Sequence, residues 1–115
     1  MNILFIHQNF PGQFKFLAPA LAQRGHNVVA TLMKPVDTAQ WQGVKLVSYR
    51  ATRSSAADVH PWVSDFETKT IRAEAWLRTA LQLKAQGFKP DVIIAHHGWG
   101  AVSYTHLTLP TILLV

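Results

Sequence analysis

Apolar residues near the start of the chain change their spacing twice within the first 32 positions. Residues 3–6 form a continuous apolar run, which is typical of a strand buried on both faces of a sheet. An apolar stripe at helical spacing follows at Phe14, Leu17, Ala18, Leu21 and Ala22. Gly25 suits the left-handed position that ends a helix, and residues 27–32 return to a strand-like run. This pattern predicts the strand, loop, helix and strand that begin an open parallel α/β sheet.

The second half of the chain repeats this alternation. Residues 44–47 form a third short strand-like run, and residues 91–95 form a fourth. Between them a long helix is predicted from His60 to a stop at Gly87. Ser64 and Glu67 have the spacing of a capping box near its start. Its apolar stripe comprises Phe66, Ala73, Leu77 and Ala80, widened by Trp76, Leu81 and Leu83.

Polar residues follow two of the predicted strands. His7 and Gln8 come directly after residues 3–6, and His96 and His97 come directly after residues 91–95. In a doubly wound sheet with strand order 3-2-1-4 the fourth strand lies beside the first. Ligands of such sheets bind at the carboxyl ends of the strands, so the two clusters are expected to face one crevice.

Composition narrows the class of protein. The chain has 115 residues, of which 49% are hydrophobic, and its formal net charge is +5. It contains no cysteine and no apolar run near the roughly 18 residues that a membrane span needs. We therefore expect one cytoplasmic domain. The basic residues are scattered, which argues against nucleic-acid binding. Arg50 and Arg53, beside Ser54 and Ser55, have the chemistry to hold a phosphate or lipid headgroup, but a plain surface loop is the favoured interpretation.

Residues 2–14, from Asn2-Ile3-Leu4-Phe5-Ile6 through His7-Gln8-Asn9-Phe10-Pro11-Gly12-Gln13-Phe14, resemble the start of family-4 glycosyltransferases. The most similar subgroup opens with a strand that runs into His-Gln-Asn-Phe-Pro-Gly-Gln-Phe. Further matches to its pattern are Leu17–Ala22, Arg24–His26, His60-Pro61, Asp65–Glu67, Gly87–Asp91, Ala95-His96 and Gly98–Gly100. The resemblance covers Met1 to about Gly100.

The resemblance implies an enzyme of the GT-B type, in which two Rossmann-like domains face each other across a cleft. The amino-terminal domain mainly receives the acceptor, and the carboxyl-terminal domain holds the nucleotide sugar. The implied reaction transfers a sugar from a nucleoside diphosphate donor to a glycan or lipid-linked acceptor with retention of configuration. No cofactor or bound metal is implied, and peripheral contact with the inner face of the membrane is compatible with this reading. The fold class is thus a Rossmann-like parallel sheet with flanking helices.

The resemblance also assigns candidate site residues. His96 matches a histidine that touches the donor sugar in the broader family, and we take it as the catalytic candidate; a structural histidine is the alternative. Gly12 either lets backbone N–H groups approach a phosphate or serves a tight turn, and both interpretations stay open. Asn9 and Gln13 are expected to bind sugar hydroxyls or to satisfy the loop's own backbone. His7 and His97 complete the substrate-binding set, and a metal site made of the three histidines is disfavoured.

Other functions were weighed against these residues. A dinucleotide fingerprint needs three glycines after the first strand, and this loop contains only Gly12. A phosphoacceptor domain needs carboxylates where this chain has His7 and Gln8. The alternative that stays open is a non-catalytic α/β module that binds a phosphorylated or sugar ligand.

The tail departs from the family pattern. Residues 101–115 are threonine-rich and interrupted by Pro110, where the resemblance implies a helix. We expect this tail to be non-native read-through, with a genuine strand at residues 107–115 as the alternative. Residues 1–100 are then an incomplete amino-terminal domain, and the chain alone is expected to be inactive.

Overall fold

The fold is taken from a computed structural model, which describes residues 1–51, 53–95 and 113–114. Along the chain the elements are β1 (Asn2–Ile6), the 3-10 helix η1 (Gly12–Phe14), α1 (Leu17–Gln23), β2 (Asn27–Leu32), β3 (Gln40–Trp41), β4 (Val44–Ser48), α2 (Pro61–Ala85), β5 (Val92–Ala95) and β6 (Leu113–Leu114).

The strands form one sheet in the order β3-β4-β2-β1-β5-β6. Every neighbouring pair is parallel except β3 and β4, which are antiparallel. The predicted order, with residues 91–95 beside residues 3–6, is therefore confirmed, and so is the α/β fold class. The short β3 was not predicted, because its two residues carry no periodic pattern.

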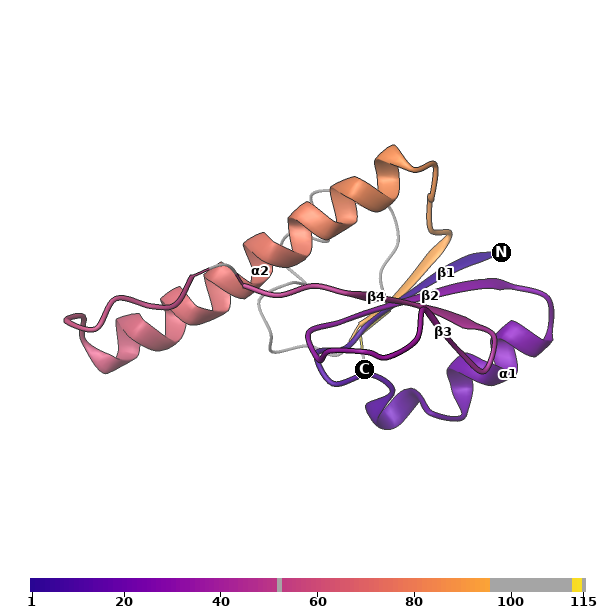
Figure 1. Ribbon diagram of the computed structural model, residues 1–115, viewed down its shortest axis with the longest axis horizontal. Coiled ribbons are helices and arrows are strands. Elements are labelled where there is room, and N and C mark those ends of the chain that lie inside the picture. Colours follow the sequence, from indigo (N-terminus) through magenta and orange to yellow (C-terminus); the bar gives the residue numbers. More distant parts are fainter. Residues whose placement is uncertain (52, 96–112, 115) are drawn as a thin grey trace.

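The two helices cover opposite faces of the sheet, as Figure 1 shows. Alternate residues of β1 account for this arrangement, because successive side chains of a strand point to opposite faces. Leu4 and Ile6 belong to the buried cluster that includes Trp76 of α2. Ile3 and Phe5 belong to the cluster that includes Ala18 of α1. Both faces of β1 are thus buried, as its unbroken apolar run indicates.

The first predicted helix is divided in two. Residues 12–14 form the 3-10 turn η1, and α1 begins three residues later at Leu17. Because the helix restarts there, its register shifts and the predicted stripe is only partly correct. Phe14 and Ala18 are buried, whereas Leu17 is 44% exposed.

Helix α2 begins one residue after His60, whose Nδ1 accepts a hydrogen bond from the Trp62 backbone N–H at 3.1 Å. His60 is therefore the N-cap. The predicted capping box is wrong, because Ser64 lies inside the helix and its hydroxyl is hydrogen-bonded to the Ser55 hydroxyl at 3.0 Å instead.

Helix α2 also extends well past the carboxyl edge of the sheet. Its 25 residues span about 37 Å, whereas a five-residue strand spans about 17 Å. No residue from 61 to 70 is buried, and burial begins at Ile71. Figure 1 shows the amino-terminal part of α2 beside the connection from β4, beyond the strands. The predicted burial of Phe66 is thus wrong, since none of the described strands lies beneath it and 72% of it is exposed.

Two further expectations concern membrane-spanning helices and residues 101–115. Over the residues that the structure describes, no helix is both long and apolar enough to cross a membrane. Leu113–Leu114 pair in parallel with β5. Most of residues 101–115 lie outside the described residues, so their division from residues 1–100 stays a prediction.

Candidate functional site

The carboxyl ends of three adjacent strands form the edge at which the candidate site lies. Ile6 of β1 pairs with Thr31 of β2, and Leu32 of β2 pairs with Ser48 of β4. The residues that follow, including His7, therefore come from neighbouring strands and share one edge. The Met33 backbone N–H donates to the Gln8 carbonyl at 2.9 Å, which joins the first two of these connections.

His7 is held by the loop that it opens. Its Nδ1 accepts a hydrogen bond from the Asn9 backbone N–H at 3.0 Å. Its carbonyl accepts one from Phe10 N–H at 3.1 Å. The Phe14 ring packs edge-on against the imidazole, with 5.8 Å between ring centroids. Because Nδ1 accepts, a neutral His7 carries its proton on Nε2. The side chain is therefore orientated by the loop before any ligand binds.

Gly12 packs directly against that imidazole. Its φ is +48°, and a Cβ built on it would lie 2.5 Å from His7 Nε2. Glycine is therefore needed for both the backbone conformation and the close approach to His7. This contact favours the structural interpretation of Gly12, because the space beside its Cα is filled by a side chain of the same loop.

Gly12→Ala is expected to destabilise the protein more than Gly25→Ala does. Both glycines have positive φ, so each alanine adds backbone strain of about 1–2 kcal/mol. Only Gly12→Ala also forces the His7 ring to move, adding about 1–3 kcal/mol, since Gly25 has open space around its Cα. Urea denaturation of both variants measures the difference. Equal losses in the two would show that the His7 contact contributes nothing.

The structure gives less evidence about the other two predicted residues of the loop, Asn9 and Gln13. Asn9 and Gln13 are exposed, and neither side chain forms a hydrogen bond with a described residue. The expectation that they satisfy the loop's own backbone through their side chains is therefore not met there. Their binding of sugar hydroxyls stays a prediction.

Gln8 belongs to the polar cluster that the sequence places at the crevice, although it is not among the predicted substrate-binding residues. Its side-chain Oε1 is buried, and none of the described residues gives it a hydrogen bond. A buried acceptor left without a donor costs about 1–3 kcal/mol. Gln8 is thus able to accept a hydrogen bond from a ligand, and only its position after β1 points to it in the sequence.

His96 and His97 lie outside the described residues. Their positions in the chain follow Ala95, which pairs with Ile6 directly before His7. The predicted role of His96 and the substrate-binding role of His97 stay predictions. Within the described part of the chain, no group of three histidine, aspartate or glutamate side chains could hold a metal ion.

A cavity of about 330 Å³ opens at the same edge, between α2 and the connection from β4. Its lining includes Met33, three arginines and three hydroxyl residues, namely Arg50, Arg53, Arg72, Ser54, Ser55 and Thr68. The sequence pointed to Arg50, Arg53, Ser54 and Ser55 as a possible phosphate site, with a plain surface loop as the favoured interpretation. Thr68 and Arg72 were not predicted, and their spacing of four residues places them on one side of α2.

Tyr49 is the first residue of this connection and is almost fully buried. Burial raises the pKa of its hydroxyl to about 12, and the charge of Arg72 opposes that rise.

Comparison with known proteins indicates the family and the fold to which this sheet and its carboxyl edge belong. A family model described as "Glycosyl transferase family 4 group" matches residues 24–115. The chain is also similar to the crystal structure of Os79 from O. sativa in complex with UDP and deoxynivalenol-3-glucoside, with a TM-score of 0.59. That match has 13% sequence identity, covers 96% of this chain and spans 28% of the Os79 chain, so it shows the fold alone. No curated protein matches the sequence.

Proposed function

This chain belongs to the glycosyl transferase family 4 group, and we propose that it is the acceptor-side domain of a GT-B glycosyltransferase. The proposed reaction moves a sugar from a nucleoside diphosphate donor to a glycan or lipid-linked acceptor, with retention of configuration. A second Rossmann-like domain would hold most of the donor. No cofactor is required by this proposal, and its proposed location is the cytoplasm.

A single observation carries the proposal: the range matched by the family model includes a strand that pairs with β1 and ends at the carboxyl edge of the sheet. β5, whose last residue is Ala95, lies within the matched range, and it pairs with β1 directly before His7. Glycosyl transfer develops negative charge on the leaving diphosphate and positive charge on the sugar ring. Polar groups fixed before the reaction stabilise such charges best, and His7 is fixed by Asn9 and Phe14.

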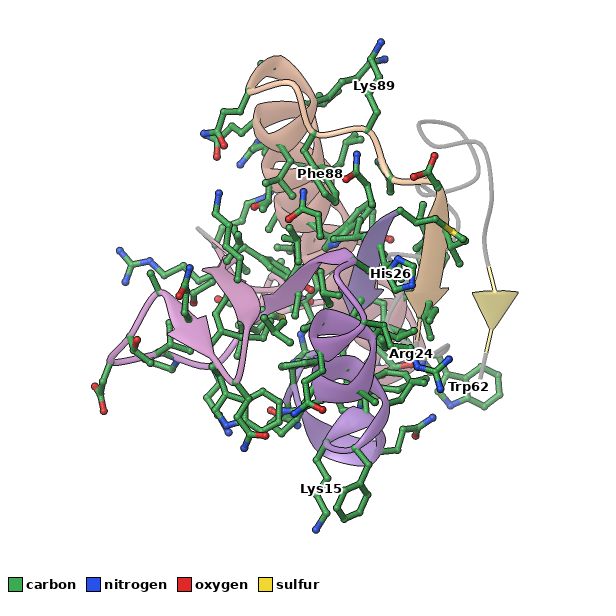
Figure 2. All side chains as sticks on the ribbon, turned by 90° about the vertical axis from the view of Figure 1, so that its right-hand side faces the viewer. Lys15, Arg24, His26, Trp62, Phe88 and Lys89 are labelled. Carbon is green, nitrogen blue, oxygen red and sulfur yellow. The ribbon has the colours of Figure 1, made fainter. Side chains whose placement is uncertain are left out.

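Contact with a membrane surface is a finer part of the proposal. Trp62, Val63 and Phe66 are exposed on the overhanging part of α2. Figure 2 shows the indole of Trp62 at the periphery of the molecule, and 83% of the residue is exposed. Aromatic side chains of this kind suit the interface between lipid and water, which supports a lipid-linked acceptor.

The 115-residue chain alone is expected to release no nucleoside diphosphate from nucleotide sugars, because the proposed donor domain is not among its residues. The measurement is coupled detection of nucleoside diphosphate from a panel of UDP, GDP and ADP sugars. The full natural gene product serves as the positive comparison. Sustained turnover by the 115-residue chain alone would contradict the division of labour between two domains.

The second candidate function is a non-catalytic module that binds a phosphorylated or sugar ligand. The arginine-lined cavity favours it, because that cavity is formed by residues of this chain alone. The same assay separates the two candidates: a full gene product that binds such a ligand and turns over no donor is a binding module.

A further inference from the structure

The cavity between α2 and the connection from β4 concentrates positive charge on a concave surface. Arg50 and Arg53 come from the connection, and Arg72 comes from α2, so the group is assembled from segments about twenty residues apart. A volume of about 330 Å³ falls at the lower end of the range for ligand clefts, roughly 300–1,000 Å³.

The balance of charge around the cavity favours an anion. No aspartate or glutamate is among the described residues that line it. Two carboxylates reach the lining from outside: Glu74 lies 3.7 Å from Arg53, and Glu67 accepts a hydrogen bond from Ser55 at 3.3 Å. Glu74 is shared, because it also pairs with Arg78. Three guanidinium groups on one concave lining repel one another, and an anion between them would relieve that repulsion.

The donor groups identify the class of anion. Guanidinium groups present paired N–H donors that match two oxygens of a phosphoryl group. Ser54 and Thr68 add hydroxyl donors, which complete the kind of shell that binds several oxygens at once. Neither hydroxyl is engaged with another described side chain. A flat basic surface would suit many polyanions, whereas a cavity of this volume suits a small phosphorylated molecule.

We propose that this cavity binds a phosphoryl group of the acceptor, so that the acceptor is a phosphorylated molecule. The assignment to the acceptor rests on the proposed function, whereas the binding of phosphate rests on the cavity alone. Met33 lines the cavity and its backbone N–H donates to Gln8, so the phosphate site adjoins the loop of His7. A phosphorylated acceptor anchored here would extend along the carboxyl edge of the sheet toward that loop.

The test is titration of the 115-residue chain with inorganic phosphate and with glucose 1-phosphate, followed by amide chemical shifts in nuclear magnetic resonance spectra. Saturable shifts are expected at residues 50, 51, 53–55 and 68–72. Arg50→Gln with Arg72→Gln is expected to weaken binding by about tenfold or more, since charge-assisted hydrogen bonds are lost. Arg24→Gln with Lys89→Gln removes the same charge from exposed positions outside the cavity and is expected to leave the affinity unchanged.

A second arm uses vesicles that contain phosphatidic acid, which separates a lipid headgroup from a soluble phosphate. Weaker binding of the Arg50→Gln, Arg72→Gln variant to phosphate, glucose 1-phosphate or these vesicles, with the control variant unaffected, supports the site. The ligand whose binding is weakened shows whether the phosphoryl group comes from a soluble molecule or from a lipid. Equal binding by the two double variants in every arm, or no binding by the unchanged chain, overturns it. These arms measure binding and not turnover. Phosphate binding at the arginines, combined with no donor turnover by the full gene product in the separate coupled assay, would therefore retain the site and reject the proposed enzyme.

Discussion

Replacing Trp76 with alanine is expected to lower the free energy of unfolding by about 3–5 kcal/mol. Trp76 is fully buried on the face of the sheet that α2 covers. Its indole N–H donates to the Thr31 hydroxyl at 3.0 Å, and that hydroxyl donates to the Phe5 carbonyl at 3.3 Å. The substitution therefore leaves a cavity and removes the donor to a buried hydroxyl. Since domains of this size are stable by only about 5–15 kcal/mol, the variant should be close to unfolding at 37 °C.

The matched control for this variant is Trp62→Ala, on the same helix. Trp62 is 83% exposed, so its loss should change stability by no more than about 0.5 kcal/mol. Thermal and urea denaturation followed by circular dichroism measure both variants. A similar loss in the two would mean that α2 is not anchored to the sheet through Trp76.

Replacing His96 with alanine in the full gene product is expected to lower kcat on the order of a hundredfold. The resemblance to family-4 glycosyltransferases assigns it contact with the donor sugar. The described part of the fold adds that β5, which ends at Ala95, lies beside the end of β1, where the fixed imidazole of His7 follows. A histidine that donates a hydrogen bond or a proton to the reacting groups acts in the transition state, so kcat should fall more than KM changes.

The control for this variant is His26→Ala at the opposite end of the sheet. His26 Nδ1 lies 3.1 Å from the amino group of Met1, and His26 precedes β2. Its loss should leave kcat unchanged. An unchanged kcat in the His96 variant, with an unchanged circular dichroism spectrum in both, would return His96 to a structural role.

The strand order was predictable largely because the adjacent strands β1 and β5 are unbroken apolar runs. A strand buried on both faces needs such a run, and residues 3–6 and 92–94 have one. Helix burial was less predictable, because periodicity shows which side of a helix is apolar but not where its supporting sheet ends. Phe66 continues the periodic stripe of α2 and is nevertheless exposed beyond the strands.

The sequence predicts where the candidate site would lie, and that location stays a prediction, but it does not predict the packing of the residues there. His7 and Gly12 were identified by their place after β1, yet their direct packing depends on the loop's conformation, which no sequence pattern encodes. Arg72 was hidden for a different reason. In the sequence it is an isolated basic residue of a helix. It becomes a candidate binding residue only because the connection from β4 brings Arg50 to the same cavity.

The most direct test of the proposed function is the anomeric outcome of turnover by the full natural gene product. Proton magnetic resonance would follow the anomeric signals of nucleoside diphosphate sugars in the presence of phosphorylated acceptors. The expected result is a new glycoside with the same anomeric configuration as the donor, formed in step with nucleoside diphosphate release. An inverted product would contradict the retaining reaction, and ligand binding without any glycoside would contradict the assignment as an enzyme.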